Sequence, residues 1–116
     1  MTSTFTNTLK KKLKAGQHTA GAWLHLCNSI AAEILSLAGF DWLLIDMEHG
    51  YGDYQTLLSQ LQGMQTGSST PLVRVQWNDQ AVIKRVLDIG AQGIMIPWIN
   101  NRTECEAAIS STRLKN

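Results

Sequence analysis

Short apolar runs alternate with segments of helical periodicity along most of the chain. Apolar runs at 20–26, 41–46, 72–76 and 93–97 predict four strands, and the second run, DWLLID, has the near-continuous apolar character of a strand buried on both faces. Apolar residues recur at helical spacing after each run, between capping residues and glycines. These segments predict helices at 30–38, at 53–62, from 78 or 79 to the glycine at 90, and at 103–111.

Four strand–helix units in succession, with no hairpin signal between them, predict an α/β fold with a parallel sheet in one domain, residues 1–116. Two architectures fit this pattern: a small doubly wound sheet, and half of a (β/α)₈ barrel, which usually needs about 250 residues. The sequence contains neither the GxGxxG fingerprint of dinucleotide-binding sheets nor a P-loop. The pattern alone leaves both architectures open.

Composition narrows the class of protein. The chain is 44% hydrophobic and 16% charged with a net charge of +1, which is typical of a globular domain. The basic run 10–14 has no interleaved aromatics and predicts the solvated face of a first helix rather than a nucleic-acid surface. No apolar run is long enough to cross a bilayer, no secretion signal is present, and Cys27 and Cys105 lack ligand spacing. We expect a cytoplasmic protein without nucleic-acid or membrane partners.

Ionisable residues gather where the second strand ends, at Asp46, Glu48 and His49. Functional groups of α/β sheets and barrels lie at the carboxyl ends of strands, and a histidine beside carboxylates is suited to general-base catalysis. The alternative is a solvated loop in which the acids only satisfy backbone amides. Arg74, inside the third strand, either reaches solvent at a sheet edge or faces a site for an anion such as a keto acid.

Three further residues, two tryptophans and an aspartate, have either a functional or a purely structural interpretation. Trp23 and Trp77 either wall a pocket or fill the core. Asp88, near the end of the third helix, opposes the helix dipole and is by pattern alone a surface charge. His18 and His25 have no partner pattern and receive no assignment.

The stretch from Ala31 to Gly50, centred on AGFDWLLIDMEHG, resembles the signature of the HpcH/HpaI aldolases. The similarity continues through PLVRV, WND, IKRVLDIGA and GIMIP and covers nearly the whole chain. The resemblance implies a (β/α)₈ barrel, of which these units are the N-terminal half, truncated at 116. It also implies a metal-dependent pyruvate aldolase that reversibly cleaves 4-hydroxy-2-oxo acids to pyruvate and an aldehyde, with Mg²⁺, Mn²⁺ or Co²⁺ as cofactor.

By the same resemblance, His49 matches the catalytic base and Arg74 the arginine that binds substrate and stabilises the enolate-like transition state. Asp88 matches the aspartate that raises the basicity of that histidine. We assign Trp23 to the substrate pocket, and Asp46 and Glu48 to the surroundings of the metal's own ligands. Those ligands are a Glu and an Asp of later strands, so we assign no metal ligand here and expect no significant activity from the chain alone.

Two alternatives to the aldolase accompany this reading. One is an inactive remnant or a self-associating half-barrel, because unpaired strand edges and exposed apolar surface favour a homo-oligomer. The other is citrate-lyase-like cleavage of an acyl thioester on the same barrel. The EHG sequence after the second strand, together with His49 and Arg74, favours the aldolase.

Overall fold

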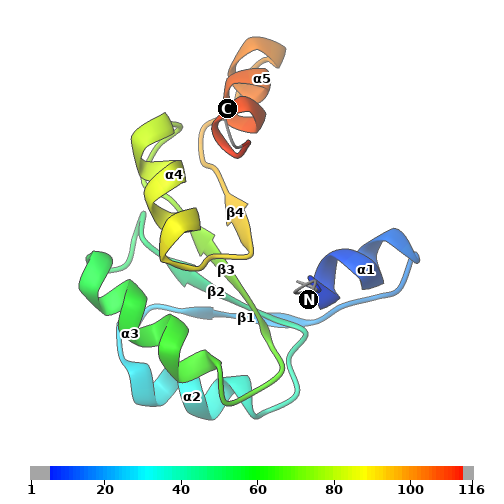
Figure 1. Ribbon diagram of the computed structural model, residues 1–116, viewed down its shortest axis with the longest axis vertical. Coiled ribbons are helices and arrows are strands. Elements are labelled where there is room, and N and C mark those ends of the chain that lie inside the picture. Colours follow the sequence, from blue (N-terminus) through cyan, green and yellow to red (C-terminus); the bar gives the residue numbers. More distant parts are fainter. Residues whose placement is uncertain (1–5, 114–116) are drawn as a thin grey trace, which may run out of the picture.

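The computed structural model describes residues 6–113, which alternate between helices and strands (Figure 1). In chain order the elements are α1 (Thr8–Lys14), β1 (Gly21–Leu24), α2 (Ser29–Ser36), β2 (Trp42–Asp46), α3 (Tyr54–Met64), β3 (Thr70–Arg74), α4 (Gln80–Ile89), β4 (Gly93–Met95) and α5 (Arg102–Ser111). The predicted α/β class and the four strand–helix units are confirmed. The N-terminal basic run lies in α1, as expected.

The four strands form one parallel sheet in the order β1-β2-β3-β4. Each strand is therefore hydrogen-bonded to the next one in the sequence, which is the arrangement of consecutive units in a (β/α)₈ barrel. The doubly wound alternative would have needed a strand order that reverses. The strand boundaries differ by up to two residues from those predicted. β1 spans Gly21–Leu24 instead of 20–26, β3 spans Thr70–Arg74 instead of 72–76, and β4 ends at Met95 instead of at 97.

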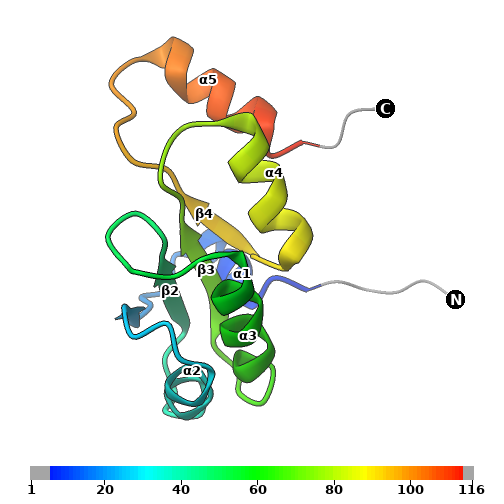
Figure 2. The same cartoon turned by 90° about the vertical axis from the view of Figure 1, so that its left-hand side faces the viewer.

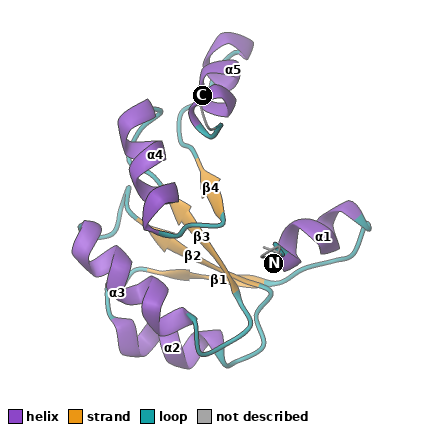
Figure 3. Cartoon of the chain, in the orientation of Figure 1, coloured by secondary structure: helices purple, strands orange, loops and turns teal. Residues whose placement is uncertain are grey.

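One face of the sheet is covered by helices (Figures 2 and 3). Leu43 and Ile45 of β2 and Val73 of β3 point to this face and are almost completely buried in the main hydrophobic cluster. Helix residues complete the cluster, namely Ala32 from α2, Leu57, Leu61 and Met64 from α3, and Ile83 and Val86 from α4. Burial of a continuous apolar layer is what fixes the register of the strands.

Polar caps define where the helices begin. Asn28, Asp53, Asp79 and Asn101 are the N-caps of α2, α3, α4 and α5, and each side chain accepts a hydrogen bond from a backbone N–H of the first turn. Gly90 ends α4 with a φ of 136°, a conformation that other residues rarely adopt. Because the strands are parallel, the loops that follow β1, β2 and β3, each ending in one of these caps, lie at one common edge of the sheet.

The second face of the sheet carries the alternate residues of each strand. At the edge where the strands begin, Asn7 donates from Nδ2 to the backbone oxygen of Gln92 at 3.0 Å, and Lys12 of α1 pairs with Asp41. Helix α1 thus lies at the amino ends of the strands, leaving a cavity of about 570 Å³ between it and β3 and β4.

Within residues 6–113, no helix has the length and apolar character needed to cross a membrane.

Candidate functional site

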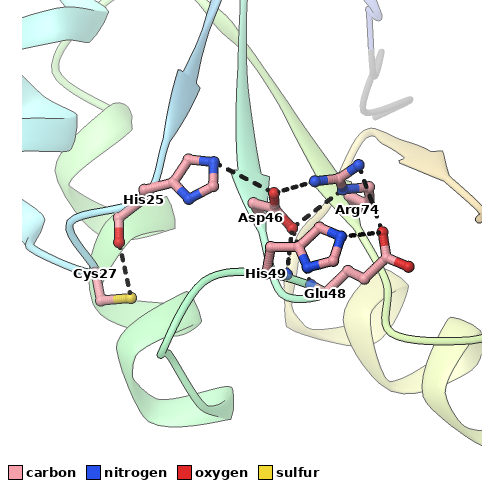
Figure 4. A network of polar contacts seen from close by, with 6 residues as sticks. All are labelled: His25, Cys27, Asp46, Glu48, His49 and Arg74. Atoms are coloured by element: carbon pink, nitrogen blue, oxygen red, sulfur yellow. Dashed lines mark hydrogen bonds and ion pairs between the residues drawn. The ribbon is translucent and has the colours of Figure 1, made fainter.

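The carboxyl ends of β2 and β3 bring Asp46 and Arg74 together. The two residues are register partners at the last position of each strand, and both point to the face opposite the helices. The guanidinium donates from Nε to Oδ1 of Asp46 at 3.1 Å and from Nη2 to Oδ2 (Figure 4). The guanidinium therefore contacts both oxygens of one carboxylate, a geometry that orients the arginine side chain.

Asp46 is buried, and only 2% of its surface is exposed. Its Oδ1 also accepts the backbone N–H groups of Glu48 at 2.9 Å and His49 at 3.0 Å, which fixes the turn after β2. Burial raises the pKa of this carboxyl, but the hydrogen bonds from Arg74 and the two backbone amides outweigh burial and lower the pKa to about 2. Asp46 is thus an ionised, fixed anion at neutral pH.

Arg74 is oriented by three neighbours. Besides Asp46, its Nη1 lies 3.4 Å from Oε1 of Glu48, and its Cζ lies 6.0 Å from the ring centroid of Trp23. The hydrogen bond to Asp46 raises the pKa of the guanidinium, against the opposing effect of partial burial. From the sequence, Arg74 could reach either solvent or a bound anion. In the structure, the anion that its guanidinium contacts is the carboxylate of Asp46.

His49 and Glu48 form the outer part of the same cluster. The His49 side chain is 67% exposed, and its Nε2 lies 3.5 Å from Oε1 of Glu48. Glu48 also accepts a hydrogen bond from Nε1 of Trp98 at 3.2 Å. Trp98 has a φ of 62°, a conformation that is uncommon for a bulky residue and can persist only where its surroundings hold it. Of the two carboxylates at the end of β2, those of Asp46 and Glu48, the one that contacts the His49 ring is that of Glu48.

The structure adds His25, to which the sequence analysis gave no role. Its Nε2 lies 3.3 Å from Oδ2 of Asp46, and half of its side chain is exposed. Leu24 of β1 pairs with Ile45 of β2, so His25 follows in register with Asp46. A usable signal was present in the sequence: His25 lies two residues after Trp23, and alternate residues of a strand share a face.

Asp88 is not brought to this cluster within the chain. It is exposed in the last turn of α4, and Gly90 and then β4 follow it. A helix that follows a strand runs back toward the edge where the next strand begins, and the nine residue steps from Asp79 to Asp88 extend about 13.5 Å along the helix axis. Within residues 6–113, Asp88 therefore lies toward the edge of the sheet opposite His49, as the position of a helix carboxyl end indicates. The role that the resemblance implies for Asp88 stays a prediction.

The donor set for a divalent cation is incomplete in this part of the molecule. Among residues 6–113, no group of three or more His, Cys, Asp and Glu side chains is arranged to hold a metal ion. Asp46 already has its oxygens occupied by Arg74 and by backbone amides, and Glu48 contacts Arg74 and Trp98. Ions such as Mg²⁺ or Mn²⁺ prefer several oxygen ligands. The described residues do not fit that requirement by themselves.

Comparison with known proteins gives one consistent result. The profile of the HpcH/HpaI aldolase/citrate lyase family matches residues 19–116. A 4-hydroxy-2-oxo-heptane-1,7-dioate aldolase from Salmonella dublin is 50% identical over 107 residues, which are 92% of this chain and 41% of that protein.

Solved structures show the same similarity. A HpcH/HpaI aldolase/citrate lyase family protein from Burkholderia cenocepacia J2315 has a TM-score of 0.89 at 39% identity, covering 94% of this chain and 44% of that one. A HpcH/HpaI aldolase from Desulfitobacterium hafniense DCB-2 has a TM-score of 0.83 at 31% identity, covering 90% of this chain and 41% of that one. This chain spans about two fifths of the length of the relatives that it matches.

Proposed function

Since the chain belongs to the HpcH/HpaI aldolase/citrate lyase family, we propose that it supplies the proton-transferring and enolate-stabilising residues of a pyruvate aldolase. The substrates are 4-hydroxy-2-oxo acids, and the products are pyruvate and an aldehyde. Among its relatives, the protein from Salmonella dublin is named as such an aldolase. Small-molecule oxo acids and aldehydes are its partners in this proposal.

One observation carries the proposal: Arg74 is held at a strand end by the ionised carboxylate of Asp46, close to the exposed imidazole of His49. A guanidinium has five N–H donors, and Asp46 takes two of them. The remaining donors can bind an oxygen of a keto acid whose negative charge grows during the reaction. A preoriented donor stabilises such charge without reorganising during the reaction.

The roles of the two residues follow from the chemistry of cleavage. His49 accepts the proton of the 4-hydroxyl group, the C3–C4 bond breaks, and the aldehyde leaves. The electron pair of that bond forms the enolate of pyruvate, whose oxygen Arg74 stabilises. A proton then returns to C3 to give pyruvate. Glu48, 3.5 Å from the His49 ring, orients the imidazole for this transfer.

A divalent cation, Mg²⁺, Mn²⁺ or Co²⁺, belongs to the proposal as cofactor, and it would polarise the keto acid. Its ligands would come from outside residues 6–113, because the described residues do not form a complete site. We also propose a cytoplasmic location and a homo-oligomeric assembly. The uncovered sheet face and the unpaired edges of β1 and β4 favour self-association.

The aldolase is favoured over the two alternatives by the same cluster. An inactive, self-associating half-barrel would have no use for an arginine held against a buried carboxylate. Such a pair is not a neutral feature of the fold, because the loss of either partner destabilises it. Citrate-lyase-like chemistry on an acyl thioester remains the second candidate, because the family name covers both reactions.

A chimaera tests the proposal. In it, residues 19–116 replace the matching segment of the Salmonella dublin aldolase, which provides the rest of the barrel. We expect the purified chimaera to release pyruvate from 4-hydroxy-2-oxo-heptanedioate with added Mn²⁺ or Co²⁺, measured by a coupled assay. A folded chimaera that releases no pyruvate but cleaves an acyl thioester would support the second candidate instead.

A further inference from the structure

Glu48 links the two residues to which the proposed chemistry belongs. Its Oε1 lies 3.5 Å from Nε2 of His49 and 3.4 Å from Nη1 of Arg74, so one oxygen faces both groups (Figure 4). Its Oε2 accepts a hydrogen bond from Nε1 of Trp98 at 3.2 Å. Only 12% of the Glu48 side chain is exposed, so the carboxylate is largely shielded from solvent. The indole therefore determines which oxygen of Glu48 is available to His49 and Arg74.

Trp98 is held in place by hydrogen bonds of its own loop. Its φ of 62° lies in the left-handed region, which a bulky residue occupies only where its surroundings impose it. The backbone oxygen of Trp98 accepts a hydrogen bond from Nδ2 of Asn100 at 3.3 Å, and the backbone N–H of Asn100 donates to Oε2 of Glu104 at 2.7 Å. The backbone oxygen of Glu104 accepts a hydrogen bond from Nδ2 of Asn78 at 3.0 Å, in the loop that follows β3. The residue with the unfavourable backbone in this anchored loop is the one whose indole reaches Glu48.

The alternative arrangement of Glu48 would interfere with the site. A guanidinium can bind a carboxylate through two parallel N–H donors, as Arg74 already binds Asp46. Of the five donors of Arg74, Asp46 leaves three, and a single oxygen of Glu48 can occupy only one of these. If both oxygens of Glu48 bound the guanidinium, one donor would be left for a keto acid, and the carboxylate would turn away from His49. A donor on Oε2 disfavours this arrangement, because the indole N–H would lose its acceptor.

From this geometry, and resting on the proposed aldolase function, we propose that Trp98 is a positioning residue. Its indole N–H holds Oε2 of Glu48, which directs Oε1 to His49 and leaves the remaining donors of Arg74 free for the substrate. Trp98 acts through Glu48 and does not itself contact the reacting atoms. The contribution of Trp98 should therefore vanish when the carboxylate of Glu48 is removed.

The contact can be measured in the 116-residue protein without substrate or metal. Nuclear magnetic resonance follows the solvent exchange of the indole N–H groups, and Trp98→Phe identifies the Trp98 signal by removing it. We expect Glu48→Ala to speed exchange at Trp98 at least about threefold, the effect of losing one modest hydrogen bond. The signal of Trp77, which is 60% exposed, should not change. Equal exchange rates at Trp98 in the unmodified protein and in Glu48→Ala would overturn the proposal.

A double-mutant cycle in the chimaera tests what the contact does for the reaction. The four proteins are the parent, Trp98→Phe, Glu48→Ala and the double variant, and kcat/KM is measured for pyruvate release from 4-hydroxy-2-oxo-heptanedioate. Phenylalanine keeps an aromatic ring at a side chain that is 69% exposed and removes the N–H donor. We expect Trp98→Phe to lower kcat/KM about tenfold in the parent and to have no effect in the Glu48→Ala background.

Arg102→Ala, at an exposed residue of α5, is the control for the assay, and circular dichroism verifies that each variant is folded. The same loss from Trp98→Phe with and without Glu48 would show that Trp98 acts through the loop itself and would overturn the proposal. A kcat/KM for Trp98→Phe equal to that of the parent would also overturn it. A folded parent chimaera that releases no pyruvate would contradict the proposed function, and the exchange measurement would then decide whether Trp98 holds Glu48.

Discussion

Asp46 and Arg74 are register partners whose side chains contact each other through both carboxylate oxygens, at the last row of β2 and β3. The carboxylate is buried, and the guanidinium is mostly so. A buried ion of this kind depends on its partner, because an uncompensated charge in a poorly solvated position is costly. The pair thus links the stability of the sheet to the geometry of the site.

Arg74→Ala should therefore lower the free energy of unfolding by about 3 kcal/mol, since it leaves the charge of Asp46 without its main partner. Arg74→Lys should cost less, because one ammonium keeps the charge but cannot contact both oxygens. Urea denaturation followed by circular dichroism measures both effects.

The matched control for Arg74 is Arg102→Ala. Arg102 pairs with Glu106 on the surface of α5, and its side chain is 91% exposed. An exposed pair of this type contributes less than about 1 kcal/mol. Equal losses for Arg74→Ala and Arg102→Ala would show that the Asp46–Arg74 pair has no special weight in the fold.

The lowered pKa of Asp46 predicts a specific acid sensitivity. The folded-state pKa is about 2, below the ordinary value near 3.9 expected for the unfolded chain. The stability from this group is therefore complete above about pH 4 and is lost as the pH falls through about 2, an effect on the order of 2 kcal/mol. Hydrogen bonds from Lys12 also lower the pKa of Asp41, and hydrogen bonds from Thr56 that of Asp53.

Comparison with Asp46→Asn separates the three carboxylates. This variant cannot ionise at position 46, so its unfolding free energy should fall less steeply between pH 4 and pH 2 than that of the unmodified protein. Parallel pH profiles for the two proteins would mean that the acid sensitivity comes from other groups, such as Asp41 and Asp53.

Gly21 is required by the position of the Trp42 ring. The two residues are register partners, and a Cβ at position 21 would lie 1.9 Å from Cδ2 of Trp42. Trp42 also packs edge-on against Trp23, with ring centroids 5.8 Å apart, so its ring cannot move freely. Gly21→Ala should destabilise the protein by about 1–3 kcal/mol.

A double-mutant cycle identifies the cause of that loss. In the Trp42→Leu background the overlap disappears, and Gly21→Ala should then cost little. Thermal unfolding of the four proteins gives the coupling. If Gly21→Ala cost as much beside Leu as beside Trp, contact with the Trp42 ring would not be the reason for glycine at this position.

Most of the fold could be predicted from the sequence, because the apolar runs and the caps act locally. The run DWLLID became β2, and Asp53, Asp79 and Gly90 begin or end helices as their types indicate. The strand ends were less accurate at β1, β3 and β4. Their limits depend on pairing with neighbouring strands, which a pattern within one segment does not contain.

The site was predictable only in part, for the same physical reason. Asp46, Glu48 and His49 adjoin each other in sequence, and Arg74 stands out as a charge inside an apolar strand. The contact between Asp46 and His25 depends on the register between β1 and β2, and the contact between Glu48 and His49 depends on the conformation of the turn after β2, so the sequence showed neither.

Asp88 is a different case. Its assignment came from resemblance alone, and the direction of α4 places it toward the other edge of the sheet. Its position near the carboxyl end of the predicted helix already indicated the edge of the sheet opposite His49, and its role stays a prediction.

The central claim is that the strand-end cluster around His49 performs aldol cleavage, and the rate of pyruvate release by the chimaera tests it most directly. His49→Ala should lower this rate by about 10²–10⁴-fold, the usual effect of removing a general base. Arg102→Ala, a change at an exposed residue of α5 outside the cluster, should leave the rate within a few-fold of the parent. A His49→Ala chimaera that is folded and releases pyruvate as fast as the Arg102→Ala chimaera would contradict the account.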